Sequence, residues 1–147
     1  MSGILVYGQP TRNRCRTYFK ITGDFDPDEV TALLGLQPDE ARRIGEPWGS
    51  KGDVNRTASW SFGRCVEYDP YVEAQMRKTI APLLDKGDLL NRIREENNVE
   101  FWLVIVPEIH AGDTNPCLAP TLDVIDFCHA TRTQIDIDMY VFDSTDV

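Results

Sequence analysis

The stretch of sequence that decides the fold is Cys15–Gly35, CRTYFKITGDFDPDEVTALLG, in which a strand pattern passes directly into a helix pattern. Over Cys15–Thr22, apolar and polar residues alternate, which is the period of a half-buried strand. Asp26 then has the side chain of a helix N-cap, Pro27 suits the first helical position, and Gly35 suits the left-handed residue that ends a helix. The stretch therefore predicts a strand followed at once by a short helix.

Further along the chain, similar signals predict three more strands and three more helical segments. The strands are expected over about 58–66, 101–106 and 133–142, and the helical segments after Asp69-Pro70, after Gly87 and after Thr121. The continuous apolar run Phe101–Val106 indicates a central strand. Residues 37–57 are expected to form a long loop, and residues 107–120 another loop with a short edge strand near 117–119.

This order of elements predicts an α+β fold. The sheet should be mainly antiparallel and built from two βαβ-like halves, with helices packed on one face. The chain has 147 residues, of which 41% are hydrophobic and 27% charged, so residues 1–147 are expected to form a single globular domain.

The sequence shows no feature of membrane insertion or secretion. It has no apolar run of the roughly 18 to 20 residues that span a bilayer, and Ile4–Tyr7 is too short for a secretory signal and is expected to be a strand. The four cysteines form no C-x-x-C pair, so we expect reduced thiols and a cytoplasmic location.

The charge of the chain is concentrated near its C-terminus. Residues 107–147 carry eight carboxylates against one cation, Arg132, while the whole chain has a net charge of −9. Such a segment disfavours nucleic acid, whose binding depends on Lys and Arg, and it equally disfavours an anionic membrane. A field of one sign favours a partner of the opposite sign, which predicts a basic protein partner.

Several motifs, taken in their order, resemble the bacterial family called domain of unknown function 4279. The resemblance covers roughly residues 15–142. It rests on Phe19-x-Ile21-x-Gly23-Asp24, Asp26-Pro27-Asp28-Glu29-Val30-Thr31, Leu34-Gly35-Leu36-x-Pro38, Trp60 within a strand and Ile135-Asp136-Ile137-Asp138-Met139-Tyr140. The family supplies no catalytic residues. Some small proteins of this kind occur in bacterial toxin-immunity systems, which is an analogy for function.

The leading hypothesis is a non-enzymatic acidic binding module, inhibitor-like or toxin-immunity-like, that engages a basic protein such as a toxin domain. The chain itself is expected to be a monomer or a weak dimer, without a cofactor, a metal ion or catalytic residues. The predicted partner-binding residues are Asp123, Asp126, Asp136, Asp138, Tyr140 and Asp143.

Other interpretations of these residues remain open. Asp136 and Asp138 lie on the same side of one strand, about 7 Å apart, so they could hold a cation or serve an enzyme in acid–base work. They could also belong to an ordinary solvated sheet face, and the acidity could serve solubility alone. His110, Cys117, Cys128 and His129 lack the spacing of zinc ligands, and Cys15, Cys65 and Cys128 are interpreted as core residues.

Trp48 is the large aromatic residue of the predicted 37–57 loop. With Arg42 and Arg43 nearby it could line a ligand cleft, but we expect it to close the edge of the core.

Overall fold

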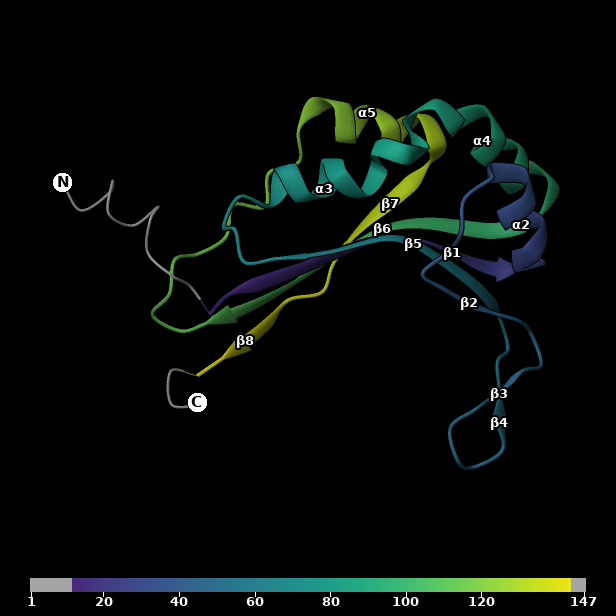
Figure 1. Cartoon of the computed structure of the whole chain (residues 1–147), viewed down its shortest axis with the longest axis horizontal. Helices are drawn as coiled ribbons and strands as arrows, with labels where there is room; N and C mark the ends of the chain where they lie inside the picture. Colours follow the sequence, from purple (N-terminus) through teal and green to yellow (C-terminus); the bar gives the residue numbers. More distant parts are fainter. Residues whose placement is uncertain (1–11, 144–147) are drawn as a thin grey trace.

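The computed structural model describes residues 12–143, and these form one mixed sheet, a small hairpin and a layer of helices (Figure 1). The predicted Ile4–Tyr7 strand and Asp146 lie outside the described residues. The elements in chain order are β1 (Arg14–Asp24), α2 (Pro27–Leu34), β2 (Glu40–Arg42), β3 (Pro47–Trp48), β4 (Asp53–Val54), β5 (Ala58–Glu67), α3 (Val72–Ile80), the 3-10 helix η1 (Ala81–Lys86), α4 (Gly87–Glu96), β6 (Asn98–His110), α5 (Leu122–Thr131), β7 (Thr133–Ile137) and β8 (Tyr140–Phe142).

The sheet is mostly antiparallel, as predicted. Its strand order is β2-β5-β1-β6-β7, and β8 also pairs with β6. All neighbours along β2-β5-β1-β6 are antiparallel, whereas β7 and β8 run parallel to β6. Phe101–Val106 lies in β6, between β1 and β7, so the prediction of a central strand is confirmed.

The helices cover one face of this sheet, and within the described part of the chain no helix lies on the other face (Figure 1). The core between the layers includes Phe19, Trp60 and Phe101 from the strands and Met76 and Leu90 from the helices. The α+β architecture with helices on one face is therefore confirmed. We call the uncovered side the open face.

The local signals in the Cys15–Gly35 stretch have the predicted structural effects. Side chains of β1 alternate between buried and half-buried positions. The Asp26 carboxylate accepts a hydrogen bond from the Asp28 N–H at 2.9 Å, which satisfies one of the free donors of α2. Gly35 ends the helix with φ 67°, a conformation in which a Cβ is costly.

The helical stretch after Asp69-Pro70 begins and breaks for identifiable reasons. Asp69 accepts a hydrogen bond from the Tyr71 N–H, but α3 begins only at Val72 and has no side-chain cap. Pro82 lies in η1, where the missing N–H and the ring interrupt α-helical bonding, and α4 starts at Gly87.

Two predicted loops contain more structure than expected. Within residues 37–57, β2 adds an edge strand to β5, and β3 and β4 form a separate hairpin. Trp48 lies in this hairpin and is 52% exposed, so the prediction that it closes the core edge is wrong. Within residues 107–120, β6 continues as far as His110, and the expected edge strand is reduced to a single bridge between Cys117 and Tyr71.

The helix α5 leaves part of its apolar surface exposed. Cys128 is buried, as expected for a core residue, and so is Phe127, but Leu122 is 77% exposed and Ile125 lies on the surface. Val124 and Thr131 fill the buried positions instead. The reason is the position of the helix, because only one narrow side of α5 faces the core.

The final predicted strand, 133–142, is interrupted at residues 138–139 but keeps one register against β6. Phe101 lies opposite Thr133 and Glu108 opposite Tyr140, which preserves the same spacing along both strands. The alternation of side chains therefore continues from β7 into β8. Among residues 12–143, no helix is long and apolar enough to cross a membrane.

Substitution of Cys128 and of Cys117 tests which of these thiols is packed in the core. Cys128 is buried in an apolar side of α5, where burial raises the pKa of its thiol to about 11. We expect Cys128→Ser to cost about 1–3 kcal/mol of unfolding free energy, because a hydroxyl replaces a small apolar group. The exposed Cys117 is the matched control, and Cys117→Ser should change stability little.

Chemical denaturation measures the stability of the two cysteine variants. A thiol reagent at pH 7 to 8 should label Cys117 first and Cys128 only after unfolding. Rapid labelling of Cys128 in the folded protein would contradict its assignment to the core.

Candidate functional site

The predicted acidic residues separate into two groups. Asp136, Asp138 and Tyr140 lie on the open face of the β7–β8 edge, where the Tyr140 hydroxyl donates to the Asp138 carboxylate at 3.3 Å. Asp123 and Asp126 lie on α5, in the helix layer on the other side of the sheet (Figure 1). The structure thus brings three of the predicted residues together along one edge.

Asp123 is the acid of this set whose charge is most clearly paired. Its carboxylate accepts a hydrogen bond from the Arg77 guanidinium at 2.9 Å and another from the Thr121 hydroxyl. These hydrogen bonds lower the pKa of Asp123, that from Thr121 most strongly. Asp126 is exposed on the same helix, and Asp143 is exposed directly after β8.

The β7 strand is the last strand of its side of the sheet, so one edge of its backbone has no neighbouring strand among residues 12–143. The Asp138 N–H donates to the Ile105 carbonyl at 2.8 Å, which points the backbone of Asp138 toward β6. Because backbone groups in a strand alternate in direction, Ile135 and Ile137 turn their N–H and C=O groups outward. An edge of this kind can accept a further strand.

The helix side of this edge carries exposed apolar side chains that sequence reasoning did not assign to a site. Ile135 is 40% and Ile137 46% exposed. A shallow groove between α5 and β7 is lined in part by Ile125, Cys128 and Ile135. The edge therefore presents carboxylates on the open face and isoleucines on the helix side.

The charges of Asp136 and Asp138 influence Tyr18, which lies two strands away on the open face. Asp136 lies opposite Val104 of β6, which in turn lies opposite Tyr18 of β1. Burial is the main cause that raises the pKa of the Tyr18 phenol, and Asp136 and Asp138 raise it further. Their charges therefore extend over the sheet surface beyond the edge itself.

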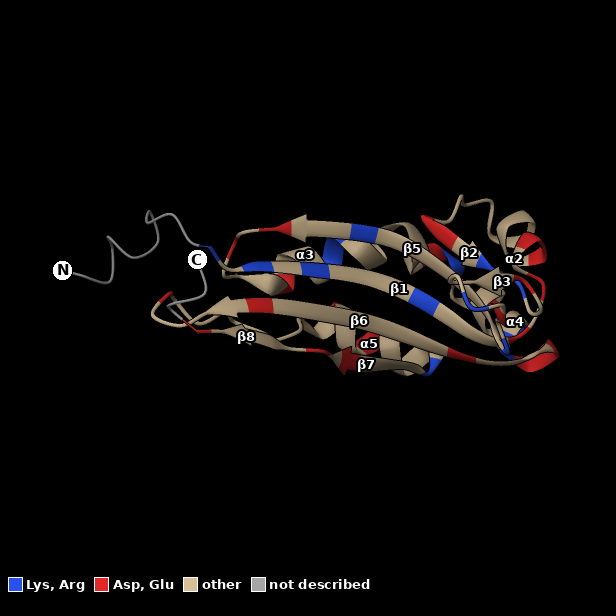
Figure 2. Cartoon of the chain, turned by 90° about the horizontal axis from the view of Figure 1, so that it is seen from below, with Lys and Arg blue, Asp and Glu red and all other residues tan. Residues whose placement is uncertain are grey.

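The open face also carries a cationic half that the sequence analysis did not assign. Figure 2 shows Lys and Arg at several points along β1 and at one point on β5. Asp136 lies at the opposite edge of the sheet, on β7, and Asp138 follows directly after this strand. Alternation along β1 places Arg16 and Lys20 on the open face together with Tyr18. The face is thus divided into a basic half and an acidic edge.

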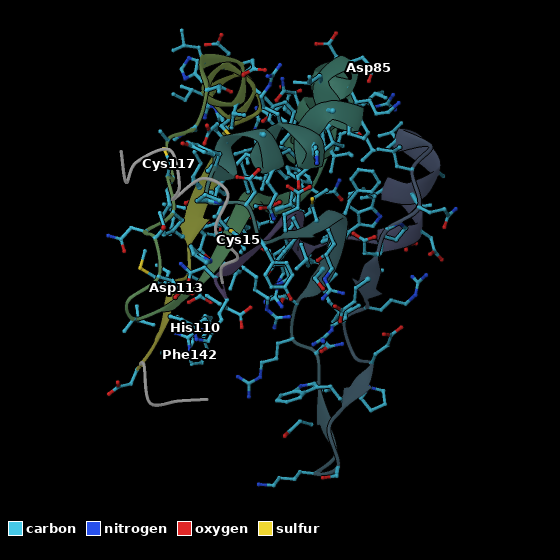
Figure 3. All side chains as sticks on the ribbon, turned by 60° about the vertical axis from the view of Figure 1, so that its left-hand side comes forward. Cys15, Asp85, His110, Asp113, Cys117 and Phe142 are labelled. Atoms are coloured by element: carbon cyan, nitrogen blue, oxygen red, sulfur yellow. The ribbon has the colours of Figure 1, made fainter. Side chains whose placement is uncertain are left out.

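The four residues considered as zinc ligands occupy positions that do not suggest a metal centre. His110 on β6 stacks on Phe142 of β8 with ring centroids 5.0 Å apart, and Cys117 lies in the loop before α5 (Figure 3). Cys128 is buried, whereas His129 is exposed. In the part of the chain that the structure describes, no three His, Cys, Asp or Glu residues form a group that could hold a metal ion.

The two arginines near Trp48 serve different surfaces. Arg43 pairs with Asp26 at 2.8 Å and also with Asp28, which ties the loop to the start of α2. Arg42 pairs with Glu40 at 2.7 Å and lines a hollow on the open face that does not include Trp48. Trp48 and Arg43 therefore do not share a cleft with Arg42. The hollow that Arg42 lines lies beside β2, whereas Trp48 lies in β3.

Comparison with known proteins identifies a family and gives no activity. No curated protein and no solved structure matched this chain. A family model matches residues 13–142, which include every element described above. The chain therefore belongs to the family described as domain of unknown function, DUF4279.

Proposed function

We propose that the chain is a cytoplasmic, non-enzymatic binding module whose β7–β8 edge binds an extended, basic segment of a partner protein. In this proposal it acts as an inhibitor, in the manner of an immunity protein that blocks a cationic toxin domain. The observation that carries the proposal is the outer edge of β7, which has no neighbouring strand among residues 12–143. Asp136 and Asp138 flank this edge on one side, and Ile135 and Ile137 flank it on the other.

An added strand would use each part of this edge. Its backbone would bond to the outward groups of Ile135 and Ile137, which is how extended peptides add to sheets. Alternate side chains of the partner would then face the isoleucines and the carboxylates in turn. Lys or Arg at every second position would suit Asp136 and Asp138, and small apolar residues would suit the groove beside Ile125.

The same charges disfavour pairing between two copies of the chain through this edge. Two β7 strands side by side would bring Asp136 and Asp138 of one copy near those of the other, and like charges across a strand pair are destabilising. Charged edges commonly prevent such association. We therefore expect a monomer or weak dimer in the absence of the partner.

The alternative function uses the same residues for a small ligand or a cation. Asp136, Asp138 and Tyr140 supply two carboxylates and a phenol on one exposed surface. Catalysis or tight metal binding usually needs more groups converging in a concave site. The edge geometry and the flanking isoleucines favour the protein-binding proposal over this one.

A designed peptide tests the proposal before any natural partner is identified. The probe alternates Lys and Val over six residues, and a control peptide of the same composition separates them into a Lys block and a Val block. We expect only the alternating peptide to shift the backbone NMR signals of residues 133–142. Its binding should weaken as salt rises from low to physiological concentration, because exposed charges attract it.

Paired variants then test the role of the two acids. Asp136→Asn with Asp138→Asn should fold normally and lower the affinity for the alternating peptide by about tenfold. Asp85→Asn with Glu95→Gln changes the net charge equally on exposed residues of η1 and α4 and should not alter it. Equal losses in both pairs, or peptide shifts outside residues 133–142, would show that binding is unspecific charge attraction.

A natural partner provides the second test. A neighbouring gene that encodes a basic toxin domain, together with loss of inhibition by the Asp136→Asn and Asp138→Asn variant, would support the inhibitor role. Full inhibition by that variant would remove the β7–β8 edge from the site.

A further inference from the structure

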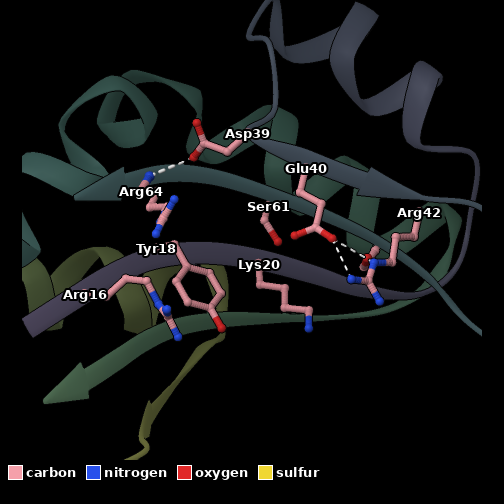
Figure 4. A pocket seen from close by; sticks show the side chains of 9 residues that line it. Arg16, Tyr18, Lys20, Asp39, Glu40, Arg42, Ser61 and Arg64 are labelled. Atoms are coloured by element: carbon pink, nitrogen blue, oxygen red, sulfur yellow. Dashed lines mark hydrogen bonds and ion pairs between the residues drawn. The ribbon is translucent and has the colours of Figure 1, made fainter. Parts of the chain in front are cut away.

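The basic half of the open face contains a hollow of about 460 Å³ between β1, β2 and β5 (Figure 4). Its volume falls in the range of pockets that hold small ligands. The lining includes Arg16, Tyr18, Lys20, Arg42, Ser61 and Arg64. The hollow is therefore polar, and it is lined by cationic side chains and hydroxyl groups.

The cations of this hollow outnumber the carboxylates that face them. Of the two acids in the lining, Glu40 pairs with Arg42, and Asp39 accepts a hydrogen bond from the backbone N–H of Arg64 at 2.8 Å. Within residues 12–143, no carboxylate lies within ion-pair distance of the side chains of Arg16, Lys20 or Arg64. Their charges remain available for an anionic ligand.

Arg64 reaches the hollow because of an irregularity in β5. The register against β1 shifts between Phe62 and Cys65, where β5 contains one extra residue. Gly63 has φ 76°, the left-handed conformation of a glycine bulge. Without the bulge, strict alternation from the buried Trp60 would turn Arg64 toward the helix layer.

The bulge is held in place from outside the strand. The Asp39 carboxylate accepts a hydrogen bond from the backbone N–H of Arg64. The backbone N–H of Asp39 donates to the Ser61 carbonyl at 2.8 Å. Thr79 of α3 donates to the Gly63 carbonyl at 2.8 Å from the other side of the sheet. These bonds fix the backbone that carries Arg64 and leave its guanidinium on the open face.

We infer that this hollow binds a small phosphate ester, with the phosphate among Arg16, Lys20 and Arg64 and the organic part against Tyr18. Guanidinium groups form paired hydrogen bonds with phosphate oxygens, and Lys adds a point charge. Ser61 and the Tyr18 phenol add neutral donors, which suits the three or more oxygens of a phosphate better than the two of a carboxylate.

The electrostatic surroundings limit the ligand to a small one. Asp136 and Asp138 lie on the same face, and the chain carries a net charge of −9. A long polyanion such as nucleic acid would extend from the hollow toward these repelling charges. The site is separate from the β7–β8 edge, so this inference does not depend on the proposed function.

Titration with matched small molecules tests the inference. Calorimetry and backbone NMR would compare glucose 6-phosphate with glucose, inorganic phosphate and succinate. We expect saturable binding of glucose 6-phosphate, weaker binding of inorganic phosphate and no saturable binding of glucose or succinate. Equal affinity for succinate would overturn the assignment to phosphate, and no saturable binding of the ester would overturn the site.

Variants that replace Arg with the uncharged Gln test where the phosphate binds. Arg16→Gln with Arg64→Gln should weaken glucose 6-phosphate binding at least tenfold and leave the peptide affinity of the β7–β8 edge unchanged. The control pair Lys51→Gln and Lys86→Gln removes the same charge outside the hollow and should retain affinity. Equal losses in the two pairs would overturn the site, and Arg16→Gln alone serves if the double variant unfolds.

Discussion

Trp60→Ala is expected to lower the unfolding free energy by about 3–5 kcal/mol, the usual range for removing a buried large aromatic residue. Trp60 lies in β5, is 0% exposed and stacks on Phe62 with ring centroids 5.6 Å apart. Its indole N–H also donates to the Thr31 hydroxyl of α2 at 3.0 Å. The substitution would both leave a cavity in the core and remove the hydrogen-bond donor to the Thr31 hydroxyl.

Trp48→Ala is the matched control for this prediction. It removes the same side chain from the β3–β4 hairpin, where the indole is 52% exposed, and should change stability by less than about 0.5 kcal/mol. Urea denaturation of both variants measures the difference. Comparable losses would mean that Trp48 packs against the core.

The contrast between these tryptophans shows which structural features a sequence of this kind encodes locally. Trp60 belongs to an alternating strand, so its burial follows from its neighbours in the chain. Trp48 lies between Pro47 and Gly49, where no period indicates a face. Whether such a residue packs depends on segments distant in the sequence, and here none covers it fully.

The same reasoning separates the helices that were predicted well from α5. The start of α2 depends on Asp26 and Pro27, adjacent residues whose effect is local. The buried side of α5 depends on how the helix lies over the sheet, and it is formed by Val124, Phe127, Cys128 and Thr131. Leu122 and Ile125 therefore lie on the surface although both are apolar.

The candidate site was predicted in part for a related reason. A net charge counted over residues 107–147 draws attention to Asp136 and Asp138, which share one face because β7 and β8 keep one register. Residues 1–57 carry equal numbers of acids and bases, which concealed the cations that β1 gathers on the open face. Charge balance along a chain does not report how charges are distributed over a surface.

The groups that sequence reasoning missed depend on tertiary structure. Arg64 reaches the open face through the bulge at Gly63, and the period of β5 alone would assign it to the other side. The signal that was present is the glycine itself, because an isolated glycine in a strand pattern often marks a bulge. Ile135 and Ile137 form part of the edge because, among residues 12–143, no strand pairs with the outer side of β7.

Gly63→Ala is expected to have the second large effect, and it tests the bulge directly. A Cβ at Gly63 would lie 2.8 Å from the Thr79 carbonyl oxygen, a backbone atom of α3. The left-handed φ of 76° adds about 1–2 kcal/mol for any residue with a Cβ. Displacement of α3 or β5 should add about 1–3 kcal/mol, the usual cost of overpacking.

Gly49→Ala separates these two contributions. Gly49 has φ 70°, close to that of Gly63, but a Cβ there would have no atom within 4 Å. It should therefore show only the conformational cost, and the difference between the two variants in urea denaturation measures the steric contact. Equal losses would mean that α3 and β5 yield freely, and that the close approach at Thr79 does not fix the bulge.

The consequence of Gly63→Ala should extend from stability to the open face. If the strand relieves the contact by losing its bulge, the register beyond Phe62 shifts by one residue and Arg64 turns away from Tyr18 and Lys20. The variant that remains folded should then bind glucose 6-phosphate more weakly, while Gly49→Ala should bind it normally. Unchanged affinity in folded Gly63→Ala would show that the bulge serves packing against Thr79 and does not position Arg64.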